Sequence, residues 1–141
     1  MDILEDNDKL NEMYRLYGIA AHNCSNIEYR IAYLLLGPKW KEIEANTPEK
    51  VQEVYDDLYS KPLGTLLKLY QHHFDFSEKT ISQMKDILDK RNHLIHRFFG
   101  SYGKNMKHIE VVDQMISELE NLVVLFQAAS HSLDPENWRK V

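Results

Sequence analysis

Apolar side chains recur every three or four residues along most of this chain, which is the spacing of one buried helix face. The pattern predicts helices over residues 8–36, 47–59, 66–74, 77–99 and 107–132. Glycine and proline separate them, with Gly37-Pro38 ending the first helix and Gly100 to Gly103 ending the fourth. Because no stretch alternates as a strand does, we expect an all-α protein, an up-and-down bundle of four to five helices.

The length of the chain favours one domain over residues 1–141, because 141 residues bury one sizeable core but rarely two. No run approaches the roughly 20 apolar residues that cross a membrane, and the acidic start, Met1 to Asp6, differs from a signal peptide. The single cysteine, Cys24, cannot form an internal disulfide, which agrees with a reducing compartment. We therefore expect a cytoplasmic protein without a membrane partner, in which Cys24 is a small core residue.

The fourth predicted helix carries strong polar groups within its apolar pattern. On an ideal helix, Arg91 falls near the middle of the apolar face, with Asn92 on its rim and His96 just beyond. A buried guanidinium without a partner is costly, so Arg91 needs an acidic neighbour. Glu28 is the one carboxylate near the middle of the apolar face of the first helix, and we predict that it pairs with Arg91.

Charge is distributed unevenly along the sequence. The whole chain carries −5, whereas residues 85–108 hold six lysines and arginines against two aspartates, a local balance of +4. The overall negative charge argues against nonspecific coating of nucleic acid, which depends on neutralising phosphates. The local excess is compatible with a phosphate site and equally with a solvated helix face.

The pattern Arg91-Asn92-x-x-x-His96, followed by the aromatic ring of Phe98, resembles the signature of the HEPN superfamily. There an arginine, four to six residues and a histidine lie on the third main helix of a small all-α bundle. The resemblance covers the bundle plan for most of the chain, and these few residues are its specific part. It implies a HEPN-like domain that is a metal-independent endoribonuclease without a cofactor, of toxin–antitoxin or phage-defence type, with RNA as substrate and an antitoxin protein as a possible partner.

The chemistry of RNA cleavage fits the residues of this motif. A histidine side chain ordinarily titrates near neutral pH and can transfer protons there, which is the role expected of His96. The planar guanidinium of Arg91 would bind the charge that develops on the phosphate, Glu28 would orient it, and Asn92 would contact the phosphate or the histidine. Flanking phosphates would be held by Lys90, Arg97, Lys104 and Lys107.

Helical geometry also predicts a homodimer. Arg91 and His96 are five residues apart, roughly 140° around an ideal helix, so one straight helix does not aim both at the same phosphate. Two copies of the helix meeting at a two-fold axis would place Arg91 of one chain beside His96 of the other. The same contact would bury Leu94, Phe98 and Phe99. We therefore expect a composite site between two chains.

Two other interpretations remain open. One is a noncatalytic HEPN-like module that binds a nucleotide, RNA or a protein; the turn Pro62-Leu63-Gly64 before Leu66 also resembles the mannitol-operon repressor family, another all-α group. The other is a helical scaffold in which Arg91 and Glu28 form a purely structural ion pair. In HEPN toxins paired with nucleotidyltransferase antitoxins, a tyrosine two residues after the histidine is modified. That place is Phe98 here, so regulation by this route is not expected.

The remaining histidines and aromatic residues receive structural interpretations. His72, His73 and His93 are expected in solvent rather than in a metal site. The aromatic side chains are expected in the core rather than on a base-stacking surface, namely Tyr14, Tyr17, Tyr55, Tyr70 and Phe74.

Overall fold

The computed structural model describes residues 8–132, and these are almost entirely helical. The helices are α1 (Asp8–Glu42), α2 (Pro48–Tyr59), α3 (Leu63–His73), α4 (Glu78–Asn92), α5 (Phe98–Tyr102) and α6 (Ile109–Ser132). A π-helical turn, His93–Arg97, joins α4 to α5, and a 3-10 turn, Gly103–Lys107, leads into α6. The all-α fold predicted from the sequence is therefore confirmed.

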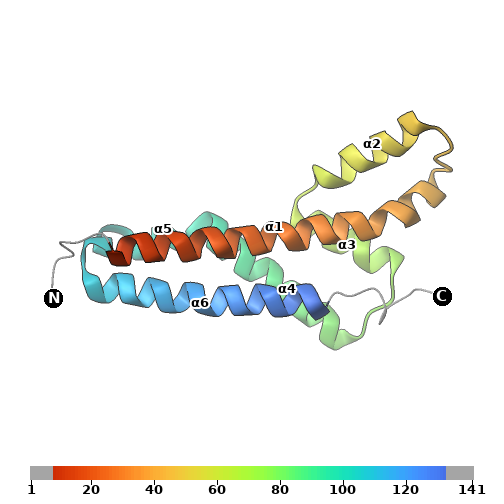
Figure 1. The fold of residues 1–141 in the computed structure, drawn as a ribbon. Coiled ribbons are helices and arrows are strands. Elements are labelled where there is room, and N and C mark those ends of the chain that lie inside the picture. The colour runs from red at the N-terminus through yellow and green to blue at the C-terminus, as the bar shows by residue number, and fades with distance from the viewer. Residues whose placement is uncertain (1–7, 133–141) are drawn as a thin grey trace.

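Successive long helices alternate in direction, which gives the bundle its up-and-down order (Figure 1). α1 and α6 lie side by side and run the same way. α4 runs against α1, so that Arg91 meets Glu28 while Leu94, farther along, meets Tyr17 nearer the beginning of α1. α2 projects from the C-terminal part of α1 and leaves the body of the bundle (Figure 1). The motif-bearing segment therefore lies against the middle of the longest helix.

The core is formed by one face of each long helix. In α1 the buried residues follow steps of three and four, the spacing of a helix face packed against neighbours, and they are Met13, Leu16, Ala20, Cys24, Ile27, Ile31 and Leu35. The facing residues of α6 are Val112, Met115, Leu119, Leu122 and Phe126. None of the helices within residues 8–132 is long and apolar enough to cross a membrane.

Cys24 belongs to this core, as predicted. Its side chain is 3% exposed, and burial, together with the nearby charge of Glu28, raises the pKa of its thiol to about 12. A thiol with such a pKa carries almost no thiolate at neutral pH, and the thiolate is the nucleophilic form. Cys24 therefore contributes packing and not chemistry.

The first helix is longer than its sequence predicts. Gly37-Pro38 does not end it, and the helix continues to Glu42. Pro38 removes one backbone hydrogen bond, but the turn beyond it is anchored because Trp40 Nε1 donates to the carbonyl of Val51 at 3.3 Å. The predicted end is wrong because this contact with α2 holds the last turn in place.

The predicted starts of α2 and α4 are confirmed by their capping side chains. Thr47 Oγ1 accepts a hydrogen bond from the backbone N–H of Lys50, and Ser77 Oγ accepts one from that of Thr80, each at 3.2 Å. α5 ends before Gly103, whose φ of +52° lies in the region that favours glycine. These local signals fix where the motif-bearing segment begins and ends.

Candidate functional site

A π-helical turn interrupts the helix that carries the motif. Such a turn joins residues five apart, instead of four, through its hydrogen bonds. The carbonyl of Leu94, inside the turn, accepts a hydrogen bond from Tyr17 Oη of α1 at 3.1 Å. Arg97 closes the turn with a φ of −128°, and its carbonyl accepts a hydrogen bond from Ser101 Oγ at 2.8 Å. Side chains of α1 and α5 thus satisfy backbone groups in the distorted segment.

The π turn brings Arg91 and His96 together within one chain. Arg91 Nη1 lies 3.5 Å from His96 Nε2 and donates to Asn92 Oδ1 at 3.3 Å. A guanidinium has only donors, so His96 takes part in this contact as an acceptor at Nε2. The inference that one helix does not aim both residues at the same point is wrong, because it assumed a straight α-helix through residues 93–97.

Glu28 holds the other edge of the guanidinium. Arg91 Nε donates to Glu28 Oε1 at 3.2 Å, which confirms the predicted pair. The side chains of Arg91 and Glu28 are 21% and 26% exposed, so the pair lies at the border of the core instead of in the middle of it. The guanidinium contacts Glu28 through Nε, and Asn92 and His96 through Nη1. The donors on Nη2 are left for an incoming ligand.

The solvent-facing side of the π turn consists of Ile95, His96 and Arg97, all of which are exposed. By contrast, Leu94 and Phe98 are each 1% exposed and belong to the core. Phe99 is half-buried, with its ring 4.8 Å from that of Tyr17. The expectation that Leu94, Phe98 and Phe99 need a second chain to cover them is therefore wrong, since the bundle itself covers them.

The basic residues predicted to hold flanking phosphates are all exposed but do not gather at one place. Arg97 ends the π turn, and Lys104 and Lys107 lie in the 3-10 turn that follows α5. Lys90 lines a hollow of about 630 Å³ between α4 and α6, which also contains Asp86, Asp89 and Glu118. Of the four, Arg97 is nearest to His96 in the chain, and Lys90 faces an acidic hollow on the α6 side.

A polar network that the sequence analysis did not predict ties the π turn to α6. His93 Nε2 lies 2.6 Å from Glu118 Oε1, and Tyr102 Oη donates to Glu118 Oε2. His93 was expected in solvent, and this expectation is wrong. The only sequence signal was a carboxylate flanked by the buried Met115, Leu119 and Leu122 on α6. The network holds the π turn and α5 against α6, whereas Arg91, at the end of α4, contacts α1 through Glu28.

Replacing Tyr102 with phenylalanine tests this network through the pH dependence of stability. Burial, followed by the hydrogen bond to Glu118 and its charge, raises the pKa of Tyr102 to about 12. Between about pH 10, where an unfolded tyrosine ionises, and pH 12, the unfolded chain loses this proton while the folded chain keeps it, so stability falls as pH rises. We expect urea unfolding at pH 8, 10 and 11 to show a smaller fall for Tyr102→Phe than for the wild type. Equal falls would contradict the network, and the Cys24 thiol contributes equally to both proteins.

Three further expectations are corrected by the structure. His73 is not simply solvated, since its Nε2 lies 3.3 Å from Glu42 Oε2. Tyr14 and Tyr55 are exposed and not in the core, whereas Tyr70 is fully buried as predicted.

No group of three or more potential metal ligands gathers within residues 8–132.

Comparisons of the chain with protein families, with curated proteins and with solved structures give no match. The functional argument therefore depends on the residues of the motif and on their geometry.

Proposed function

We propose that this protein is a metal-independent endoribonuclease that acts through Arg91, Asn92 and His96 and resembles HEPN toxins of the toxin–antitoxin or phage-defence type. The observation that carries the proposal is the 3.5 Å contact between Arg91 Nη1 and His96 Nε2. It places a permanent cation and a proton acceptor within reach of one phosphodiester, at a surface open to solvent. The π turn that creates the contact supports it further, because such turns occur often at functional sites.

His96 supplies the proton transfer in this mechanism. When the substrate binds, His96 Nε2 exchanges its contact with Arg91 Nη1 for the ribose 2′-hydroxyl and takes that proton. The 2′-oxygen then forms a bond to the adjacent phosphorus. The bond from phosphorus to the 5′-oxygen breaks, and that oxygen takes a proton from water. The products are a 2′,3′-cyclic phosphate and a 5′-hydroxyl. A strand without 2′-hydroxyls offers no nucleophile and is not cleaved.

Arg91 stabilises the charge that the reaction places on the phosphate oxygens. Glu28 fixes the guanidinium through Nε. The Nη2 donors, and the Nη1 donor that leaves His96 when the substrate binds, would bind the phosphate oxygens. Asn92 holds Nη1 through its Oδ1 at 3.3 Å, which leaves its Nδ2 group outside that contact. Arg97 is placed to bind a neighbouring phosphate at the end of the turn.

We infer that the protein forms a homodimer in which each chain carries its own Arg91 and His96. The resemblance to dimeric HEPN ribonucleases supports the dimer, as does Ile95, an apolar side chain that is 40% exposed beside His96. The intrachain contact of the two motif residues favours a complete site in each chain over a composite one. A cognate antitoxin would act by covering this surface.

The test is incubation of the purified protein with labelled single-stranded RNA in EDTA. We expect endonucleolytic cleavage that persists without divalent ions. The alternative is a noncatalytic module that binds a nucleotide, RNA or protein, in which Glu28 would hold the same guanidinium for a bound anion. RNA binding without cleavage would support that alternative. If the protein neither binds nor cleaves RNA, the pair of Arg91 and Glu28 is purely structural.

A further inference from the structure

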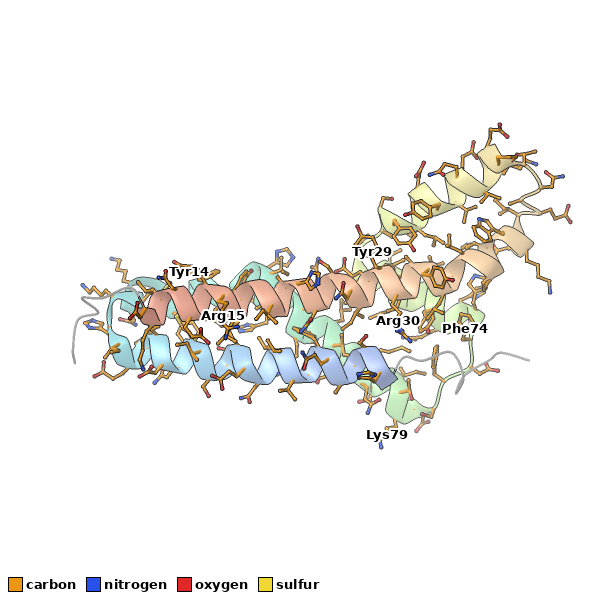
Figure 2. The ribbon with its side chains drawn as sticks, viewed as in Figure 1. Tyr14, Arg15, Tyr29, Arg30, Phe74 and Lys79 are labelled. Carbon is orange, nitrogen blue, oxygen red and sulfur yellow. The ribbon has the colours of Figure 1, made fainter. Side chains whose placement is uncertain are left out.

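Four tyrosines cluster where the C-terminal end of α2 packs against α1, on the side of α1 next to the candidate site. They are Tyr29 and Tyr33 of α1 and Tyr55 and Tyr59 of α2. The ring centroid of Tyr59 lies 5.3 Å from that of Tyr29 and 4.3 Å from that of Tyr55. Figure 2 shows Tyr29 on the side of α1 that faces α2. We name these four residues the tyrosine cluster.

The cluster is not a continuation of the core. Tyr29, Tyr33 and Tyr55 are 60%, 66% and 43% exposed, although each ring offers a large apolar surface. Tyrosines that only packed α2 against α1 would bury their rings, as Tyr70 does. Rings that remain in solvent next to a cavity are available to a planar ligand.

A pocket of about 230 Å³ lies beside the cluster and connects it to the candidate site. It is lined by residues of α1, α2, α3 and the turn between α2 and α3, among them Ser25, Glu28, Tyr29, Tyr59 and Lys61. Glu28 is shared, because it also accepts the hydrogen bond from Arg91 Nε. A ligand in the pocket would therefore lie one side chain away from the guanidinium.

We propose that the tyrosine cluster and this pocket bind a nucleobase of the RNA strand whose phosphate lies at Arg91 and His96. Every base has a π-face that stacks on aromatic rings, and stacking of this kind is sequence-tolerant. The carboxylate of Glu28 accepts hydrogen bonds from exocyclic amines of bases, and the ammonium of Lys61 attracts the backbone. Stacking would thus position the strand, and Arg91 and His96 would act on it. The choice of RNA as occupant rests on the proposed function.

A protein occupant fits the same surface less well. The pocket combines an acid, a base and a serine with flat rings and has few aliphatic side chains in its lining, Ala32, Leu58 and Leu66. Lys61 Nζ lies 3.3 Å from Asp57 Oδ1, so the charges at the mouth are partly compensated, and stacking carries most of the binding. Planar polar heterocycles match this lining.

The experiment measures binding of a fluorescein-labelled, 12-nucleotide mixed-sequence RNA by anisotropy, in EDTA, to protein carrying His96→Ala so that the strand stays intact. We expect Tyr29→Ala to weaken binding about tenfold, because stacking of one base contributes ~1–3 kcal/mol. Tyr29→Phe keeps the ring and should bind within about twofold of the parent. Tyr14→Ala is the matched control, since Tyr14 is a half-exposed tyrosine of the same helix, well separated from Tyr29 (Figure 2). At 1.5 Å per residue, the two positions are ~22 Å apart along the helix axis.

The outcomes separate this inference from the proposed function. If Tyr29→Ala binds RNA as tightly as the parent does, or if Tyr14→Ala loses as much affinity as Tyr29→Ala, the tyrosine cluster is not the base site. In that case cleavage of RNA by the wild type still supports the ribonuclease proposal. If the wild type does not cleave RNA but binding falls in Tyr29→Ala and not in Tyr29→Phe, the base site stands and the ribonuclease proposal fails. If the wild type does not bind RNA, both fail. Melting temperatures establish that each variant folds.

Discussion

Replacing His96 with alanine is expected to lower the kcat for RNA cleavage by about 10²–10⁴-fold, the usual contribution of a general acid–base residue. The fold should be unaffected, because His96 is exposed and its polar contact is the one with Arg91. Single-turnover cleavage of a labelled RNA in EDTA gives the rate, and thermal unfolding gives the stability. His131→Ala is the matched control, since His131 is an exposed histidine at the far end of α6.

Three results would contradict this role of His96, and the first two concern the cleavage rate alone. One is cleavage by His96→Ala at the wild-type rate. Another is an equal loss in His131→Ala, which would show that removing any exposed histidine impairs the protein. A loss of rate accompanied by a large fall in melting temperature would assign His96 to the fold, contrary to its exposure.

Replacing Arg91 should impair both chemistry and stability. We expect Arg91→Ala to lower kcat by about 10²–10³-fold, as removal of a preorganised donor to a developing oxyanion does in other enzymes. Arg91→Lys should recover little of this rate, because an ammonium keeps the charge but lacks the planar fork that contacts Glu28, Asn92 and His96 together. Arg91→Ala leaves Glu28 without its partner at the border of the core, so its unfolding free energy should fall by ~1–3 kcal/mol, and Arg91→Lys should lose less because its ammonium keeps a charge opposite Glu28.

Arg97→Ala serves as the control for charge alone. Arg97 is exposed at the end of the π turn, and its loss should raise KM for RNA more than it lowers kcat. If Arg91→Ala instead changed only the melting temperature, Arg91 would be a structural partner of Glu28.

Mixing Arg91→Ala with His96→Ala protein adds a further control: a site complete within each chain predicts no recovery of cleavage, whereas recovery would show a site composed from two chains.

The fold was accessible from the sequence because its determinants are local and repeated. Apolar residues at helical spacing and the caps at Thr47 and Ser77 each act over a few residues, and each is found where the pattern predicts it. The predicted end of the fourth helix is less accurate, because α5 continues through Gly100 and ends only before Gly103. The pair of Glu28 and Arg91 was predicted because each is a lone charge within an apolar pattern, and the signs are opposite. A prediction based on opposite charges remains correct even when the buried face of a helix is assigned with an error of one residue.

The geometry of the site was not accessible because it depends on tertiary contacts. The sequence does not predict a π turn at residues 93–97. The turn is held by the hydrogen bond from Tyr17 of α1 and by the contact of His93 with Glu118 of α6. A straight helix sends His96 away from Arg91, and the turn returns it to within 3.5 Å. The same error assigned Leu94 to an interface between chains, although it lies in the core.

The sequence did not predict the extension of α1 past Pro38 or the tyrosine cluster, and the reason is related. Helix breakers are judged by the hydrogen bond they remove, but the contact of Trp40 with Val51 compensates for it. Aromatic residues at helical spacing predict a core, yet Tyr29 contacts only the C-terminal end of α2 through Tyr59 and remains 60% exposed. In each case the outcome depends on where a second helix lies.

The most direct measurement uses a DNA strand that contains a single ribonucleotide, incubated with the protein in EDTA. The proposed mechanism predicts one cut, on the 3′ side of that ribonucleotide, which leaves a 2′,3′-cyclic phosphate and a 5′-hydroxyl, and it predicts no cut in the all-deoxy strand or with His96→Ala. Cleavage of the all-deoxy strand, a requirement for a divalent ion, or an intact mixed strand together with intact all-RNA substrate would contradict it.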